Sequence, residues 1–375
     1  MSGSRLMKRW LAAVLGICCA AGTAALTATG AAQAAVPDRW GFAFVSAPSV
    51  PGIPDLQHQA GSWPAPFHVH TAPGAVGQVF VRFPKIASKG GVVHVTAVGD
   101  GRPVWCQAQK WGPSGGSEVV AVRCYRASAG PAMPVFAPFA ITYSTSSKGA
   151  FPAGRGYGYV HFRPGSGIVA RFNSSGGTNT VTHGPAGVWL VTMPGLGTGT
   201  QAGGVQVTAV NPAGPAKCQL SGWASSAARL RFVVRCYNGM ATPLNTGWTL
   251  SYQRRRAITG GQPAHFAYTI DNKPLLAGPY APAPPGVNFN SAGGINDIRS
   301  AGTGLRFVRL PRVGKRPDNV LVTGFKTGPG FCNLITVWAT TGGAVKDVLV
   351  RDVECFTATG VPKNHASLIT YMSSH

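Results

Sequence analysis

Hydrophobic and polar residues alternate along short runs of this chain, as is typical of β-strands with one buried and one exposed face. Apolar side chains take every second position in the runs 78–83 and 188–194, where they are Val79, Val81 and Phe83, and Trp189, Val191 and Met193. Clusters of Gly, Pro, Asn and Ser separate these runs and predict turns. The pattern therefore predicts an all-β protein.

The same order of elements occurs three times, which indicates an internal repeat. Each copy has an aromatic opening strand, a strand that ends in proline, a β-branched run, two cysteines with a tryptophan between them, and a closing tyrosine. The prolines are Pro84, Pro194 and Pro311, and the β-branched runs are 93–98, 205–210 and 320–325. We divide the chain into a leader, 1–35, and three copies: copy 1 (36–147), copy 2 (148–257) and copy 3 (258–375).

A copy of about 110 residues is long enough to bury a core of its own. The number of short strands in each copy predicts a β-sandwich, so we expect three sandwiches in tandem. A six-bladed β-propeller with two four-stranded blades per copy is the alternative.

The leader has the pattern of a secretory signal peptide. Arg5, Lys8 and Arg9 precede an apolar stretch, and small residues lead to an A-x-A cleavage site at 32–34. A membrane span and a lipoprotein anchor at Cys18 or Cys19 fit this segment less well. We expect a mature chain that begins near Ala35, has no membrane span, and is extracellular or associated with the cell envelope.

Six cysteines remain after the leader, and an even count in an exported chain predicts disulfides. The repeat selects the pairs Cys106–Cys124, Cys218–Cys236 and Cys332–Cys355. Each bridge closes a loop of 18 or 23 residues, which stabilises a fold by roughly 3 kcal/mol in the chain-entropy model. A zinc site is disfavoured, because no C-x-x-C pair or paired histidine lies near these cysteines.

The combined pattern of opening strand, Asn-Ser-Gly turn, proline-ended strand, Val-Thr-Ala-Val run and Cys…Trp…Cys-aromatic resembles secreted repeat proteins of actinobacteria. The resemblance covers residues 39–371 and implies secretion and a β-rich fold. It supplies no catalytic residues. Copy 1 departs from the pattern, because a longer segment, 46–70, replaces the Asn-Ser-Gly turn.

The charge of the chain is strongly positive, with 33 basic and 10 acidic residues. Without the leader the net charge is +20, and such a surface attracts polyanions. Copy 2 contains no carboxylate side chain, because none occurs between Glu118 and Asp271. Basic residues cluster at the seam of copies 2 and 3 and within copy 3, which suggests an anion-binding strip: Arg254, Arg255, Arg256, Arg299, Arg306, Arg309, Arg312, Lys315 and Arg316.

Two motifs resemble hydrolase sites. Ser114 lies in a G-x-S-x-G sequence, but a nucleophile elbow needs a strand before it and a helix after it, so we interpret 112–116 as a turn. Asp352 and Glu354 are the only closely spaced carboxylates, about 7 Å apart on one strand face, a spacing that suits an inverting glycosidase or a cation site. The equivalent of Glu354 is Arg123 in copy 1 and Arg235 in copy 2, which favours a solvent-facing column of charges.

His68 and His70 would lie on one strand face, where a metal ion would need a third ligand such as His58 or Asp55. An exposed pair is the simpler interpretation. No nucleotide, cofactor or metalloprotease motif occurs in the chain, and no nucleic-acid-binding module is recognisable. We therefore expect no cofactor and no resident metal.

Two classes of function remain. The first is a non-enzymatic binding or adhesion protein, whose basic surface associates with anionic cell-wall or extracellular polymers. The second is a secreted hydrolase directed at polysaccharides or esters, with its site in copy 3.

Overall fold

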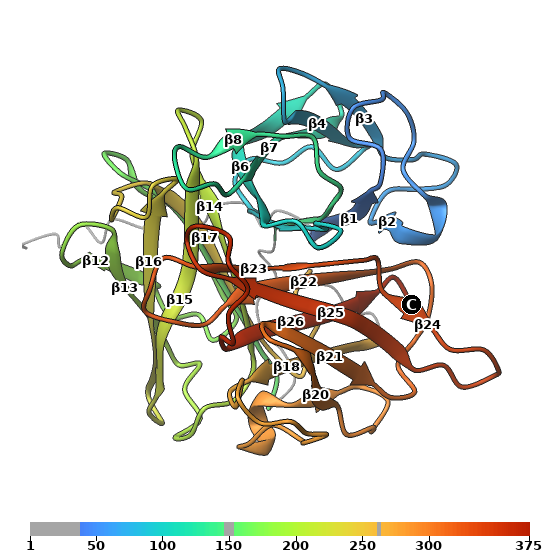
Figure 1. Cartoon of the computed structure of the whole chain (residues 1–375), viewed down its shortest axis with the longest axis vertical. Helices are drawn as coiled ribbons and strands as arrows, with labels where there is room; N and C mark the ends of the chain where they lie inside the picture. Colours follow the sequence, from blue (N-terminus) through green and yellow to red (C-terminus); the bar gives the residue numbers. More distant parts are fainter. Residues whose placement is uncertain (1–37, 146–153, 261–263) are drawn as a thin grey trace, which may run out of the picture. The chain divides into compact units, whose positions relative to one another are not determined.

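The computed structural model describes residues 38–145, 154–260 and 264–375, all within one compact unit, Ala35–His375 (Figure 1). The predicted leader lies outside the described residues. Strands make up most of the described chain, and its only helices are the short 3₁₀ turns η1 (Leu56–His58) and η2 (Pro285–Val287). Neither is long or apolar enough to cross a lipid bilayer. The predicted all-β class is confirmed.

Each copy contains two layers of antiparallel strands, which we call the inner sheet and the outer sheet. The inner sheet contains the opening strand, the closing strand and the β-branched run, and the outer sheet contains the two cysteine strands. In copy 1 the inner sheet has the order β2 (Gln59–Gly61), β1 (Arg39–Val45), β9 (Phe139–Thr145), β5 (Val92–Ala97). The outer sheet has the order β6 (Val104–Ser114), β7 (Ser117–Arg126), β4 (Gln78–Phe83), β3 (His70–Pro73), with β8 (Met133–Pro134) beside β7.

Copies 2 and 3 repeat this topology. The inner sheet of copy 2 is β11 (Gly167–Asn173), β10 (Gly156–Arg163), β17 (Gly247–Arg254), β14 (Gly204–Val210), and its outer sheet is β12 (Thr180–His183), β13 (Val188–Pro194), β16 (Arg229–Asn238), β15 (Ala216–Ser225). A parallel pairing of β14 with β6, between Val210 and Ala108, joins this inner sheet to the outer sheet of copy 1 as one nine-stranded sheet. The inner sheet of copy 3 is β19 (Phe289–Asn290), β18 (Phe266–Asp271), β26 (Ser367–Ser373), β22 (Asp318–Gly324). Its outer sheet is β20 (Asp297–Gly302), β21 (Leu305–Leu310), β25 (Val348–Phe356), β23 (Phe331–Leu334), with β24 (Ala339–Thr340) beside β25.

The two sheets of a copy share one core, as in a β-sandwich. In copy 1, Val81 of the outer sheet and Ile141 of the inner sheet belong to the same cluster of buried side chains. Each inner sheet joins the first and last strands of its copy, whereas a propeller blade is formed by four consecutive strands. Three sandwich-like repeats are therefore confirmed, and the propeller alternative is wrong.

The three predicted disulfides are present, and each links residues that lie directly opposite each other on neighbouring strands. The pairs are Cys106–Cys124, Cys218–Cys236 and Cys332–Cys355, with Cα–Cα distances of 4.0–4.1 Å. The repeat therefore predicted the pairing correctly, and the bridges fit an oxidising compartment.

The β-branched strand of each inner sheet is buried on both faces, unlike the outer strands. In β4 and β13 buried side chains alternate with partly or fully exposed ones, as the sequence predicts. In β5, β14 and β22 every residue is buried. One face of each of these three strands packs against the outer sheet of its own copy. The other face carries polar side chains that bond to the other copies.

Three equivalent threonines connect the copies in a cycle. Thr96 of copy 1 bonds to the backbone of Val322 in copy 3, where its Oγ1 accepts from N at 2.8 Å and donates to O at 3.2 Å. Thr323 of copy 3 bonds in the same way to Val207 of copy 2, at 3.1 and 3.2 Å. Thr208 of copy 2 accepts from Val95 N of copy 1 at 3.2 Å, and this bond closes the cycle.

A second cycle uses the residue after the first cysteine of each copy. Gln107 donates to Asn211 O and Gly214 O of copy 2, at 2.6 and 2.8 Å. Gln219 donates to Lys326 O of copy 3 at 3.2 Å. Asn333 donates to carbonyls of copy 1, Arg102 O and Val104 O, at 3.1 and 3.0 Å.

These side chains bond to backbone N–H and C=O groups of the neighbouring copy, as buried polar groups require. Both cycles join copy 1 to copy 2, copy 2 to copy 3 and copy 3 to copy 1. The three sandwiches consequently form one closed assembly within a single compact unit.

Candidate anion-binding surface

Carboxylates contribute little to the surface of this protein, because most are paired or buried. Three ion pairs have N–O distances of 2.7–2.9 Å: Arg306–Asp271, Arg309–Asp297 and His58–Asp318. Glu118 and Glu354 are buried, and desolvation raises the pKa of each to about 7. The positive charge of the chain is therefore poorly compensated at the surface, above all in copy 2.

The outward face of β16 in copy 2 carries a column of three arginines. Arg229 and Arg231 are exposed and Arg235 is partly exposed, whereas the alternate residues Leu230 and Phe232 are buried in the core. Strand geometry places Arg229 and Arg231 about 7 Å apart, and Arg235 about 13 Å beyond Arg231. Because copy 2 lacks carboxylates, no acidic side chain of its own can neutralise this column.

Small neutral residues flank the arginine column. Arg231 lies between Thr192 of β13 and Ala224 of β15, and Thr180 of β12 lies directly beyond Thr192. Figure 1 shows these four strands side by side as one sheet. Short side chains leave the guanidinium groups accessible along the face, an arrangement suited to an extended ligand.

The full column does not recur in the other copies. The proline-ended strand gives the register: Arg231 and Arg235 of copy 2 correspond to Val119 and Arg123 of copy 1. In copy 3 the same positions hold Leu349 and Glu354. The column is therefore specific to copy 2, and a structural requirement of the repeat does not explain it.

The predicted strip at the seam and in copy 3 is only partly available to ligands. Arg256 is buried, donates to Gly260 O at 2.6 Å through Nε, and lies 3.9 Å from Asp38. Arg254 is partly exposed and Arg255 is exposed. Of the remaining residues, Arg299, Arg312 and Lys315 are exposed and Arg316 donates to Gln57.

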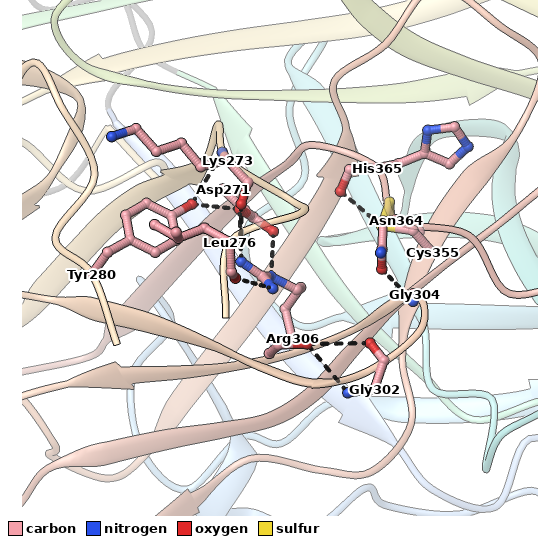
Figure 2. Close-up of polar contacts among 12 residues, drawn as sticks. Asp271, Lys273, Leu276, Tyr280, Gly302, Gly304, Arg306, Cys355, Asn364 and His365 are labelled. Atoms are coloured by element: carbon pink, nitrogen blue, oxygen red, sulfur yellow. Dashed lines mark hydrogen bonds and ion pairs between the residues drawn. A yellow bond between two sulfur atoms is a disulfide. The ribbon is translucent and has the colours of Figure 1, made fainter. Parts of the chain in front are cut away.

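Arg306 is excluded from any external anion site, because it is 1% exposed and enclosed by acceptors (Figure 2). Its Nε donates to Asp271 Oδ2 at 2.8 Å, and its two terminal nitrogens donate to Leu276 O and Lys273 O. Tyr280 donates to the same carboxylate. The prediction that Arg306 binds anions is wrong, because this ion pair fixes the loop between Asp271 and Tyr280.

Arg309 is exposed but already paired. It lies 2.7 Å from Asp297 and 3.7 Å from Asp347, and its hydrogen bond to Asp297 raises its pKa. The predicted strip therefore loses Arg256, Arg306 and Arg309 as free cations. Sequence reasoning did not single out the column on β16, although the absence of carboxylates in copy 2 was its signal.

Asp352 and Glu354 occupy unusual positions on β25. Asp352 lies at a β-bulge with a left-handed φ of 57°, a conformation that is uncommon for a non-glycine residue. Glu354 is 5% exposed, and its Oε2 has no hydrogen-bond partner in the described part of the chain. Burial raises its pKa, and the nearby Asp352 raises it further. The interpretation of Glu354 as part of a solvent-facing column is wrong.

His68 and His70 line an open pocket of about 440 Å³ in copy 1. Arg82, Lys85 and Ser117 line the same pocket, and Lys85 lies over the ring of Phe67. The two cationic side chains beside the histidines would repel a metal cation, so this pocket suits an anion better. Ser114 lies at the exposed turn between β6 and β7, as the turn interpretation predicts.

Sequence reasoning missed Lys217, a buried lysine of copy 2. It directly precedes Cys218, a position that holds Trp105 in copy 1 and Phe331 in copy 3. A lysine in place of a core aromatic residue was the available signal. Comparison with protein families, with curated proteins and with solved structures finds no match for this chain.

Proposed function

We propose that this chain is an exported, non-enzymatic protein that binds anionic polymers of the cell envelope or extracellular space. The arginine column on β16 is the observation that supports this proposal. Arg229 and Arg231 are exposed, and small neutral residues flank Arg231. Arg235 is partly exposed and donates to Ser221 Oγ at 3.2 Å, and the full column occurs only in copy 2. An extended polymer with a negative charge at intervals of about 7 Å would match Arg229 and Arg231, since strand rise sets that spacing.

Guanidinium groups suit this role because each presents a planar fork of donors to phosphate or carboxylate oxygens. The closed assembly supports the proposal as well, because it holds the outer sheet of copy 2 on a rigid base. Export is consistent with the predicted leader, the three disulfides and the resemblance to secreted actinobacterial repeat proteins.

Sedimentation with isolated cell walls tests the proposal. The protein should bind at low ionic strength and be released as the salt concentration approaches about 0.5 M, because salt screens exposed charge contacts. Replacing Arg229, Arg231 and Arg235 together with glutamine should abolish most of the binding. If the wild-type protein stays on the cell walls at high salt, binding through exposed charge contacts is contradicted.

A hydrolase with a site in copy 3 is the alternative, and Glu354 is the observation that favours it. A carboxyl group whose pKa is raised to about 7 suits a general acid. Turnover of a polysaccharide or ester panel, lost in the variant Asp352→Asn/Glu354→Gln, would replace the binding proposal with this one.

A further inference from the structure

A small cavity lies where the three copies meet. Its volume is about 50 Å³, and equivalent residues of all copies line it, including Thr96, Thr208 and Thr323. The first cysteine of each disulfide, Cys106, Cys218 and Cys332, lines it too. One water molecule needs roughly 10–15 Å³ of such space, so the cavity has room for a few waters or a small ion.

Among the described residues that line this cavity, Lys217 is the only basic one. The residue is 5% exposed, and its Nζ lies 4.5 Å from the ring centroid of Trp105 and 5.0 Å from that of Phe331. These aromatic rings attract the ammonium group electrostatically, but they offer no nitrogen or oxygen lone pair that accepts a hydrogen bond from it. Within the described part of the chain, Nζ has no hydrogen-bond partner.

The surroundings of Lys217 add positive charge. Lys326 is close enough to be repelled by Lys217 and Lys363, and His365 is repelled by Lys326 and Lys363. Burial lowers the pKa of Lys217 to about 8, and burial followed by repulsion lowers that of Lys326 to about 7. No carboxylate acts on either lysine as a cause of these shifts.

A buried ammonium group with three unused donors is costly unless a partner is supplied. The threonine hydroxyls of the lining already bond to the backbone of neighbouring copies. Gln219 also belongs to the lining and its Oε1 has no partner in the described part of the chain, but this oxygen is neutral and leaves the charge of Lys217 uncompensated. A negative ion is the partner that would use the donors of Lys217 and reduce its repulsion with Lys326.

We propose that this cavity binds a small inorganic anion, of the size of chloride or nitrate, through Lys217. The site is separate from the arginine column of the proposed function, and it touches all three copies at once. A bound anion would consequently stabilise the closed assembly. The cavity would not bind the polymer.

Bromide is the probe that tests this site, because its anomalous scattering locates it directly in crystals of the full chain. We expect a bromide peak in the cavity beside Lys217 Nζ in the wild-type protein. The variant Lys217→Met keeps an unbranched side chain between the two rings but removes the charge, and it should lose the peak. Arg231→Gln, a matched loss of charge on the surface, should keep it.

Chloride-35 line broadening measures the same event in solution. The wild-type protein should broaden the line at pH 6, and the broadening should fall as the pH rises above about 8 and Lys217 loses its proton. Lys217→Met should weaken chloride binding at least tenfold. An empty cavity in wild-type crystals soaked in bromide, or a bromide peak that persists in Lys217→Met, would overturn the proposal.

Discussion

Thr96 and Val322 exchange two hydrogen bonds although 226 residues separate them in the chain. The threonine hydroxyl takes the place of a strand partner for a backbone N–H and C=O that would otherwise be buried without one. The equivalent contact at Thr208 joins copy 2 to copy 1, and the one at Thr323 joins copy 3 to copy 2. The fold therefore behaves as an intramolecular trimer.

Thr96→Val should destabilise the whole assembly. Valine matches threonine in shape but leaves Val322 N and O buried without their partner, a loss of about 1–3 kcal/mol. We expect calorimetry to show one transition at a lower temperature. Thr246→Val is the matched control, because Thr246 bonds to Val210 O inside copy 2 and should cost only about 1 kcal/mol. Two separated transitions in Thr96→Val would show that the copies unfold independently.

Loss of the disulfide in copy 2 should also affect all copies. Cys218→Ser/Cys236→Ser opens a loop of 18 residues and should lower the free energy of unfolding by about 3 kcal/mol. Gln219, next to Cys218, bonds to copy 3, so the damage should spread there. Hydrogen exchange should become faster in β22 as well as in β15 and β16. Faster exchange confined to copy 2 would contradict the closed assembly.

The buried carboxyl groups of Glu118 and Glu354 should each contribute less stability at pH 8 than at pH 5, whereas the buried histidines His94 and His161, whose pKa values are lowered to about 3, contribute in the opposite direction. The pKa values of the two glutamates are about 7 in the folded protein, against an ordinary value of 4.5 for a glutamate side chain. The folded state therefore holds protons on these carboxyl groups that the unfolded state releases, so their contribution to stability falls as the pH rises from about 4.5 to 7.

Glu118→Gln and Glu354→Gln remove this effect. Each should raise the free energy of unfolding at pH 8 by about 1 kcal/mol and leave it nearly unchanged at pH 5. Denaturation with urea at both pH values measures the difference. Equal effects at the two pH values would mean that these groups do not titrate as the structure indicates.

Much of this fold follows from local sequence patterns. Period-two alternation identifies strands such as β4 and β13, and the repeated cysteines identify the disulfides, because both signals lie within one copy. The run 93–98 shows the limit of this reasoning. Its β-branched residues predict a strand, but they do not tell whether the face that carries Thr96 meets solvent or another copy.

The site was harder to predict for a related reason. Arg306 and Arg231 both lie on strands, yet Arg306 is buried and paired with Asp271, whereas Arg231 is exposed and forms no ion pair within the described residues. The difference depends on a carboxylate 35 residues away from Arg306 in the chain. A cluster of basic residues in a sequence therefore does not show which of them are paired with a carboxylate in the folded protein and which are available to a ligand.

The affinity for a soluble polyphosphate, measured over a salt series, tests the role of the β16 column most directly. Arg229→Gln/Arg231→Gln/Arg235→Gln is compared with a triple variant of equal charge in copy 3, Arg299→Gln/Arg312→Gln/Arg351→Gln, whose residues are all exposed. We predict a loss of about tenfold or more at low salt for the copy 2 variant, since three exposed charge contacts contribute roughly 1–3 kcal/mol. The copy 3 variant should change the affinity much less. Equal losses in the two variants would contradict the proposed surface.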